Sequence, residues 1–214
     1  MNTLLVSDAV MKVRKNLDEQ GLNDSVMYTD EGSDNTSMDQ LIAKTLPEAI
    51  NAVHRAAPAH RLEGEDVRSD ASISVSEGVV LFSLPAHVLR ITALRAVDSE
   101  IVVTDILSEA SAEGRKQLNP YFRGTYDRPR LVRVQHNGED DHFRYYSLAA
   151  GTASSAPIAQ LDVIYEQKYT ADATSYKVSV GLKEAVIAQL TGMVLAIYGE
   201  TDKAQYFITQ ASSK

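Results

Sequence analysis

The sequence predicts an α+β protein: a helical bundle formed by N- and C-terminal helices, with an antiparallel β-rich region inserted between them. Two observations predict this class. Apolar residues recur at about the 3.6-residue period of a helix near both termini, and at about the two-residue period of a strand between residues 73 and 167. Because the apolar face of each terminal helix needs a partner, we expect these helices to pack on one another.

The first helix is predicted to begin at Ser7, a good N-cap residue, and to end at Gly21, a good C-terminal stop. Its apolar residues are Val10, Val13 and Leu17. Residues 21–36 are mostly polar and predict a loop.

The second helix is predicted to begin at a capping box, with Ser37 as the N-cap and Gln40 three residues later. The residues of its apolar face are Met38, Leu41, Ile42, Thr45, Leu46, Ala49, Ile50 and Val53. Pro47 lies within this run. Since proline lacks an N–H group and crowds the preceding turn, we expect it to kink the helix or to divide it in two.

Six strands are predicted in the middle of the chain: Ile73/Val75, Val79/Leu81, Leu89/Ile91, Leu131–Val134, Phe143/Tyr145 and Leu161/Val163/Tyr165. Asn137-Gly138 predicts a hairpin turn between the fourth and fifth strands. A short helix is expected over residues 108–118 and a loop over residues 149–157.

The last segment predicts a long helix, followed by a final helix that Thr201 can cap. Gly199 stands at the expected end of the long helix. Its apolar stripe comprises Leu182, Ala185, Val186, Leu190, Met193, Val194 and Ile197. The expected domains are therefore residues 1–66 with 178–214, the helical bundle, and residues 67–177, an antiparallel β domain with one short helix.

Composition narrows the class of function. The 214 residues include 29 acidic and 21 basic side chains, so the net charge of −8 argues against a surface that binds nucleic acid throughout, although a local basic patch is possible. The absence of cysteine excludes disulfides, thiolate metal sites and cysteine nucleophiles. No segment predicts a signal peptide or a membrane span, and we expect a soluble protein made in a cytoplasm.

No motif favours an enzyme. There is no Gly-x-Ser-x-Gly elbow and no glycine-rich phosphate loop. The residues His54, His60, Glu63, Glu65 and Asp66 match no recognised metal-ligand spacing, and surface histidines beside an acidic turn explain them more simply. We expect no catalytic residue, no metal and no cofactor, and keep a metal-dependent hydrolase using Glu63–Asp66 as a distant alternative.

Arginines and aromatic residues are interleaved in one part of the chain. The arginines are Arg115, Arg123, Arg128, Arg130, Arg133 and Arg144. The aromatic residues are Tyr121, Phe122, Tyr126, Phe143, Tyr145 and Tyr146. Three interpretations stay open: strands with surface arginines and core aromatics, a protein–protein interface rich in the residue types that dominate binding energy, and nucleic-acid contact through stacking aromatics.

Three segments with X-Pro corners suggest a family. They are Leu84-Pro85-Ala86-His87-Val88-Leu89-Arg90-Ile91, Gln117-Leu118-Asn119-Pro120-Tyr121-Phe122-Arg123-Gly124-Thr125 and Arg128-Pro129-Arg130-Leu131-Val132. These segments resemble the β-rich middle of tailed-phage head-to-tail connector proteins and are most similar to the ring proteins of crAss-like phages. The first also resembles the tail adaptor of short-tailed phages, whose corner is nearer Leu-Pro-Asp-Asp-Phe-Leu-Arg; Ala86-His87-Val88 replaces Asp-Asp-Phe here.

The resemblance implies a structural virion protein, a head-to-tail connector or adaptor that forms an oligomeric ring between portal and tail, with the helical bundle as the ring wall. The family's rings are usually twelvefold. The implied partners are further copies of the chain, the portal protein and neighbouring tail or ring proteins. Genome DNA would pass through the channel without sequence-specific contact, and no membrane is involved. The implied location is the head–tail junction of the virion, after assembly in the host cytoplasm.

Tyr121, Arg123, Arg128 and Arg130 are the candidate interface residues. The alternative function is a cytoplasmic peptide- or nucleic-acid-binding module that uses the Arg/Tyr-rich β insertion.

Overall fold

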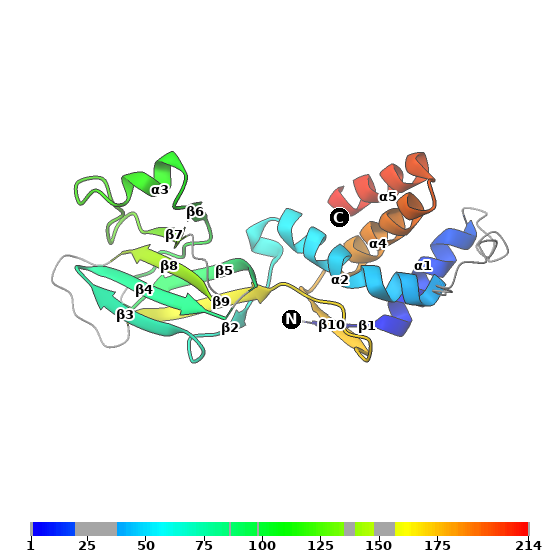
Figure 1. Ribbon diagram of the computed structural model, residues 1–214, viewed down its shortest axis with the longest axis horizontal. Coiled ribbons are helices and arrows are strands. Elements are labelled where there is room, and N and C mark those ends of the chain that lie inside the picture. Colours follow the sequence, from blue (N-terminus) through cyan, green and yellow to red (C-terminus); the bar gives the residue numbers. More distant parts are fainter. Residues whose placement is uncertain are drawn as a thin grey trace. The chain divides into compact units, whose positions relative to one another are not determined.

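The computed structural model of the chain is a mixed α+β structure with five α-helices and several sheets among its described residues (Figure 1), as the sequence predicts. It divides into two compact units, Met1–Leu62 with Gln167–Lys214 and Glu63–Glu166. None of the described helices is both long and apolar enough to cross a membrane. The residues that the structure describes are 2–19, 38–85, 87–97, 99–134, 140–147 and 157–213.

Four helices lie in the first unit: α1 (Val6–Glu19), α2 (Met38–Ala56), α4 (Lys183–Ile197) and α5 (Thr201–Ser213). α4 contacts the other three. It is therefore buried on several faces rather than along one stripe, and its buried residues are Ala185, Val186, Ile187, Ala188, Leu190, Thr191, Gly192, Val194 and Leu195. An apolar surface that surrounds a helix requires neighbours on every side, and segments from both ends of the chain supply them here.

Two glycines determine how α5 packs on α4. Gly199, with a φ of 81°, follows the end of α4 and allows the chain to reverse. A Cβ atom on Gly192 would stand 2.8 Å from the side chain of Ile208 and 2.9 Å from the carbonyl oxygen of Ala204. The absence of a side chain at Gly192 thus allows the two helices to approach closely.

α2 continues through Pro47 as one helix, so the proline does not divide it. Losing a backbone hydrogen bond at proline costs roughly 3 kcal/mol. Burial of one large apolar side chain contributes about 1.5–3 kcal/mol, and Leu46, Ala49 and Ile50 around the proline are all fully buried. Packing of this face therefore outweighs the local penalty.

A two-stranded sheet that the sequence did not predict joins the N-terminus to the start of the last helical segment. β1 (Asn2–Leu5) pairs antiparallel with β10 (Ser175–Val178). The Nζ atom of Lys183 in α4 also donates to the carbonyl oxygen of Thr3 at 2.7 Å. Residues 167–177, which the sequence assigned to the β domain, thus lie in the unit that contains the terminal helices.

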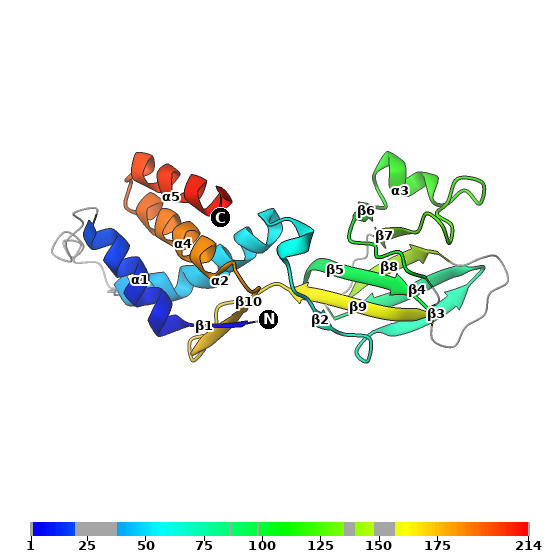
Figure 2. The same ribbon diagram turned by 180° about the vertical axis from the view of Figure 1, so that it is seen from behind.

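The second unit contains two sheets. One has the strand order β3-β4-β8-β7-β6 and the other has the order β2-β9-β5. Figures 1 and 2 show them as two layers, with a different sheet in front in each view. The strands are β2 (Glu65–Asp66), β3 (Ser72–Ser76), β4 (Val79–Leu84), β5 (Val88–Ala96), β6 (Ile106–Ser108), β7 (Arg130–Val134), β8 (Asp141–Tyr146) and β9 (Ile158–Tyr165).

The core of this unit lies between the two sheets, and each of the six strands that the sequence predicted is present. Phe82 and Phe143 stack at its centre, with 5.0 Å between their ring centroids. Apolar residues of both sheets surround them: Val80, Leu84, Ile91, Leu94, Leu131, Tyr145, Leu161 and Val163.

One strand pair departs from the antiparallel pattern that the sequence predicts. β6 runs parallel to β7, whereas the other ladders are antiparallel among the described residues. Parallel neighbours cannot be joined by a tight turn and require a long crossover. Residues 109–129 provide this connection, and they include the predicted short helix, α3 (Ala112–Lys116).

Several predicted features fall outside the described residues. They are the Ser37 cap, the loop at 21–36, the Asn137-Gly138 turn and all of the loop at 149–157 except Pro157.

A buried histidine connects α2 to the segment after β10. His54 is fully buried, and its Nε2 atom accepts a hydrogen bond of 3.2 Å from the backbone N–H of Ser179. A nitrogen that accepts cannot carry a proton, so the ring is neutral with its proton on Nδ1. Burial lowers the pKa of His54 from 6.5 to about 4.

This pKa predicts that the protein loses stability in mild acid. Because the unfolded chain binds the His54 proton near pH 6.5 and the folded chain only near pH 4, the full stability is present above pH 6.5. It falls by about 3 kcal/mol as the pH drops from 6.5 to 4. Urea unfolding across this range measures the loss. His54→Gln should flatten the profile, and His60→Gln, on the exposed turn after α2, should leave it unchanged.

Candidate interaction surface

The crossover between β6 and β7 begins with α3, which is fixed against β6. Ser111 caps α3: its Oγ atom accepts from the N–H of Gly114 at 3.0 Å and donates to the carbonyl oxygen of Ser108 at 2.6 Å. A Cβ atom on Gly114 would collide with that same carbonyl at 2.0 Å. Only glycine therefore allows α3 to lie this close to the strand.

The buried side chain of Gln117 joins α3 to the loop that follows it. Its Oε1 atom accepts from the N–H of Gly124 at 2.8 Å, and its Nε2 atom donates to the carbonyl oxygen of Glu113 at 3.2 Å. A Cβ atom on Gly124 would stand 2.9 Å from both the backbone nitrogen of Arg130 and the carbonyl oxygen of Tyr146. The loop is thus held between α3 and the ends of β7 and β8.

Short-range hydrogen bonds shape the rest of the loop. The Oδ1 atom of Asn119 accepts from the N–H of Tyr121 at 3.0 Å, and its carbonyl oxygen accepts from the N–H groups of Phe122 and Arg123. Thr125 and Arg128 then exchange two backbone hydrogen bonds across a tight turn. The loop therefore has a defined conformation without burying its large side chains.

The large apolar side chains of this loop face solvent. Tyr121 is 93% exposed and Phe122 is 70% exposed, and Leu118 and Tyr126 are also exposed. Side chains of this size and chemistry gathered on one short segment are typical of a contact surface for another molecule. We call this the 115–130 surface; it comprises Arg115, Leu118, Tyr121, Phe122, Arg123, Tyr126, Arg128 and Arg130.

The six arginines divide into two groups. Arg133 is paired with Asp141 at 2.6 Å and lies over the ring of Phe143, and Arg144 is paired with Glu109 at 2.7 Å. These two stabilise the sheet. The guanidinium groups of the other four form no ion pair or hydrogen bond with any described residue: Arg115, Arg123, Arg128 and Arg130.

The structure thus separates the interpretations of the interleaved arginines and aromatics. Phe143, Tyr145 and Tyr146 are buried strand residues, as the first interpretation expects. The 115–130 surface does not fit that interpretation and remains available for a partner. Of the candidate interface residues, Tyr121, Arg128 and Arg130 are exposed and Arg123 is half-buried.

The sequence analysis named four further members of this surface but did not choose them as interface candidates: Arg115, Leu118, Phe122 and Tyr126. Phe122 is nearly as exposed as Tyr121. The large side chains of Leu118, Tyr121 and Phe122 predict burial as readily as exposure, and the turn at Asn119 in the structure reveals which occurs. The proline corner was the available signal, because it makes continuation of α3 through this segment unfavourable.

The surface is strongly positive in an acidic chain. Between residues 113 and 130, five basic side chains stand against two acidic ones, a net charge of +3 in a chain of net charge −8. A hydrogen bond and the charge of Lys116, 2.6 Å away, lower the pKa of the Glu113 carboxyl, and Arg130 adds a smaller effect. An acidic partner would therefore be favoured here.

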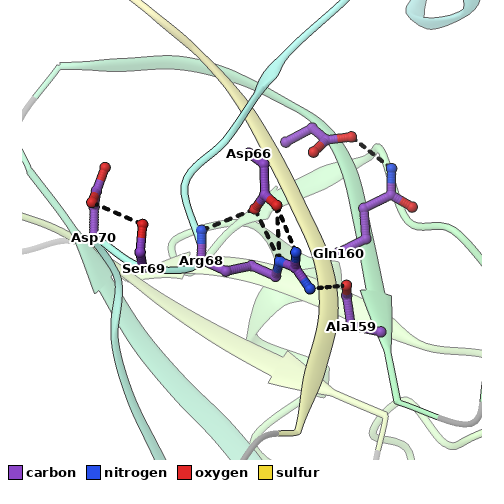
Figure 3. A network of polar contacts seen from close by, with 7 residues as sticks. Asp66, Arg68, Ser69, Asp70, Ala159 and Gln160 are labelled. Atoms are coloured by element: carbon purple, nitrogen blue, oxygen red, sulfur yellow. Dashed lines mark hydrogen bonds and ion pairs between the residues drawn. The ribbon is translucent and has the colours of Figure 1, made fainter.

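The described residues give no geometric support for a metal-dependent hydrolase. Asp66 is held by Arg68, whose Nε and Nη2 atoms donate to its carboxylate at 2.7–3.1 Å (Figure 3). This pairing lowers the pKa of Asp66. His54 is buried against Ser179. Within the part of the chain that the structure describes, no group of three or more histidine, aspartate or glutamate side chains could hold a metal ion.

No protein-family model matches the chain, and no curated protein matches it in sequence.

The role of Gln117 in holding the surface is testable. Gln117→Ala would remove two hydrogen bonds made by a buried side chain, to the N–H of Gly124 and the carbonyl oxygen of Glu113, which together contribute about 1–3 kcal/mol. We expect urea unfolding to show a loss of this size. Lys116→Ala, which removes an exposed ion pair from the same helix, is the matched control and should change stability by less than about 1 kcal/mol. Equal effects of the two substitutions would contradict the assigned role.

Proposed function

We propose that this protein is a structural virion component, a head-to-tail connector or adaptor that assembles into an oligomeric ring between portal and tail. Two of the three segments that carry the family resemblance, 117–125 and 128–132, contribute to the 115–130 surface. The third, 84–91, joins β4 to β5, and the N–H of Val88 there donates to Asp141, the partner of Arg133. Two of the three segments thus coincide with the exposed surface, whereas the third lies at the opposite end of the β7–β8 pair.

The exposed aromatic pair is the observation that carries the proposal. Burying a side chain as large as Tyr121 or Phe122 contributes roughly 1.5–3 kcal/mol, and aromatic and arginine residues supply most of the binding energy at protein interfaces. An isolated chain gains none of this energy, since both side chains remain in water. A stable contact would still require about 1,000 Å² or more of buried surface in total.

In this proposal α1, α2, α4 and α5 form the helical bundle of the ring wall, and residues 63–166 form the inserted region that touches other proteins. The partners are further copies of the chain, the portal and neighbouring tail or ring proteins. The net charge of −8 favours a channel along which DNA slides without being held. The role requires no catalytic residue and no cofactor.

The same surface also favours a second candidate, a cytoplasmic module that binds a peptide or a nucleic acid. Proteins that bind single-stranded nucleic acid stack bases on exposed aromatic rings and contact phosphates with arginines, and this surface has both, its guanidinium groups forming no ion pair with any described residue. The two candidates differ in partner and in salt dependence, so binding measurements separate them.

The first test is self-association. We expect the purified protein to form oligomers whose population rises with concentration in sedimentation velocity, or to form them when portal is added. Tyr121→Ser combined with Phe122→Ser should weaken this association by about tenfold or more, because both aromatic anchors are lost. Tyr206→Ser, at a position in α5 that is 62% exposed, is the matched control. A wild-type protein that stays monomeric at all concentrations and binds no portal would refute the proposed ring.

The second test is nucleic-acid binding. A ring protein of this charge should bind short single-stranded DNA weakly at physiological salt. Gel shifts at several salt concentrations measure this. Tight binding that falls steeply with salt and disappears in the Tyr121/Phe122 variant would favour the binding module instead.

A further inference from the structure

The five-stranded sheet of the second unit ends at a strand with a free edge. In the strand order β3-β4-β8-β7-β6, β3 pairs with β4 and with no other described strand. Figures 1 and 2 show β3 on the side of this unit away from α3. The outer edge of β3 therefore lies at the opposite end of the sheet from the 115–130 surface, and the ring contact proposed above does not use it.

The hairpin turn after β3 determines which of its backbone groups point outward. Glu77 and Gly78, the two residues between β3 and β4, have positive φ angles of 51° and 74°, as a type I′ turn requires. The residues on either side of such a turn exchange backbone hydrogen bonds. Because this exchange occurs at every second residue of an antiparallel ladder, the N–H and C=O groups of Ile73 and Val75 point away from β4.

These outward groups have no partner among the residues that the structure describes. Neither Ile73 nor Val75 forms a backbone hydrogen bond outside the ladder with β4. Edge strands of many proteins are protected from pairing by a charged side chain, a proline or a bulge. β3 has none of these, since its sequence is Ser-Ile-Ser-Val-Ser and its register with β4 is regular. The edge is therefore open to another strand.

We propose that β3 of one copy pairs antiparallel with β3 of a second copy, which joins the two sheets into one. The outward donors and acceptors stand at positions 73 and 75, so an antiparallel partner must present its own with the same spacing. A second β3 does so when Ile73 lies opposite Val75 of the second copy, because the residues of each such pair can exchange two hydrogen bonds. This contact goes beyond the proposed ring and does not depend on it.

The side chains fit the same register. Serines alternate with aliphatic residues, so the strand reads nearly the same in both directions. Ile73 and Val75 are half-buried and would form aliphatic pairs across the new ladder. Ser74 would lie opposite Ser74 of the second copy, on the two-fold axis, and no like charges would meet within the strand. Since the two surfaces are identical, the contact is isologous and produces a two-fold dimer.

A pair of cysteine variants tests the register. The chain has no cysteine, so a single introduced thiol can form a disulfide only with a second copy. Facing residues of a non-hydrogen-bonded pair, as Ser74 would be, have Cα atoms about 4.5 Å apart, which a disulfide can span. Under mild oxidation, we expect Ser74→Cys to form a covalent dimer on a non-reducing gel.

Ser72→Cys is the matched control, because Ser72 is equally exposed on the same strand. In the proposed register Ser72 lies opposite Ser76, so the two Ser72 residues stand roughly 13 Å apart along the strand. A disulfide cannot bridge this separation. We therefore expect Ser74→Cys to crosslink about tenfold faster or more than Ser72→Cys.

Charges at the same position provide a second test. Ser74→Lys and Ser74→Glu each place two like charges opposite one another across the two-fold axis, and each variant alone should fail to pair. An equimolar mixture of the two variants should associate about tenfold more tightly or better than either alone in sedimentation velocity. Because Ser74 is exposed in the single chain, neither substitution should disturb its fold.

The outcomes separate this contact from the ring. Both tests are repeated with Tyr121→Ser and Phe122→Ser in the same chain, which should weaken the ring contact and leave crosslinking at Ser74 unchanged. Equal crosslinking of the two cysteine variants, or a mixture that associates no better than its components, would overturn the β3 pairing and leave the ring standing. Loss of crosslinking in the aromatic variant would overturn β3 as an independent contact. Crosslinking at Ser74 in a protein that forms no ring would support the pairing alone.

Discussion

The apolar circumference of α4 is the constraint on which the first unit depends. A helix that is apolar on all sides cannot rest on one neighbour, and α4 contacts α1, α2 and α5. Those helices come from opposite ends of the chain, so burial of α4 brings the termini into one unit. The pairing of β1 with β10 and the hydrogen bond from Lys183 to Thr3 reinforce the same connection. Residues 63–166 form the other compact unit.

The second unit is packed around a core between two sheets rather than around one helix. Two sheets bury a shared core around Phe82 and Phe143. The ion pair of Arg133 with Asp141 stays partly exposed to water. Once these contacts are made, the arginines and aromatics of the crossover have no role in holding the sheets together. Their exposure is consistent with a contact outside the chain, because leaving Tyr121 and Phe122 in water gains nothing for folding.

Periodicity predicted the long elements well and the short ones poorly. The six alternating strands and the helices at both ends are present because their apolar residues repeat over many positions. β1, β2, β6 and β10 have two to four residues each, too few for a period to emerge. Their positions depend on distant partners. The candidate residues Tyr121, Arg123, Arg128 and Arg130 came from the interleaving of arginines with aromatic residues. The exposure of Phe122 depends instead on the hydrogen bonds of Asn119 and Gln117, which that pattern does not reveal.

The parallel pairing of β6 with β7 explains why an exposed surface exists in this unit at all. Antiparallel neighbours can be joined by a tight turn, and such a turn would leave no room for the 115–130 surface. A parallel pair must instead send the chain out of the sheet and back, here through residues 109–129. A crossover of this kind is usually a helix that covers the sheet. α3 has only five residues, so most of the connection projects as a loop, and Gln117 and Gly124 must hold it. The parallel pairing thus requires a long connection between β6 and β7, and the exposed part of this connection carries arginine and aromatic side chains.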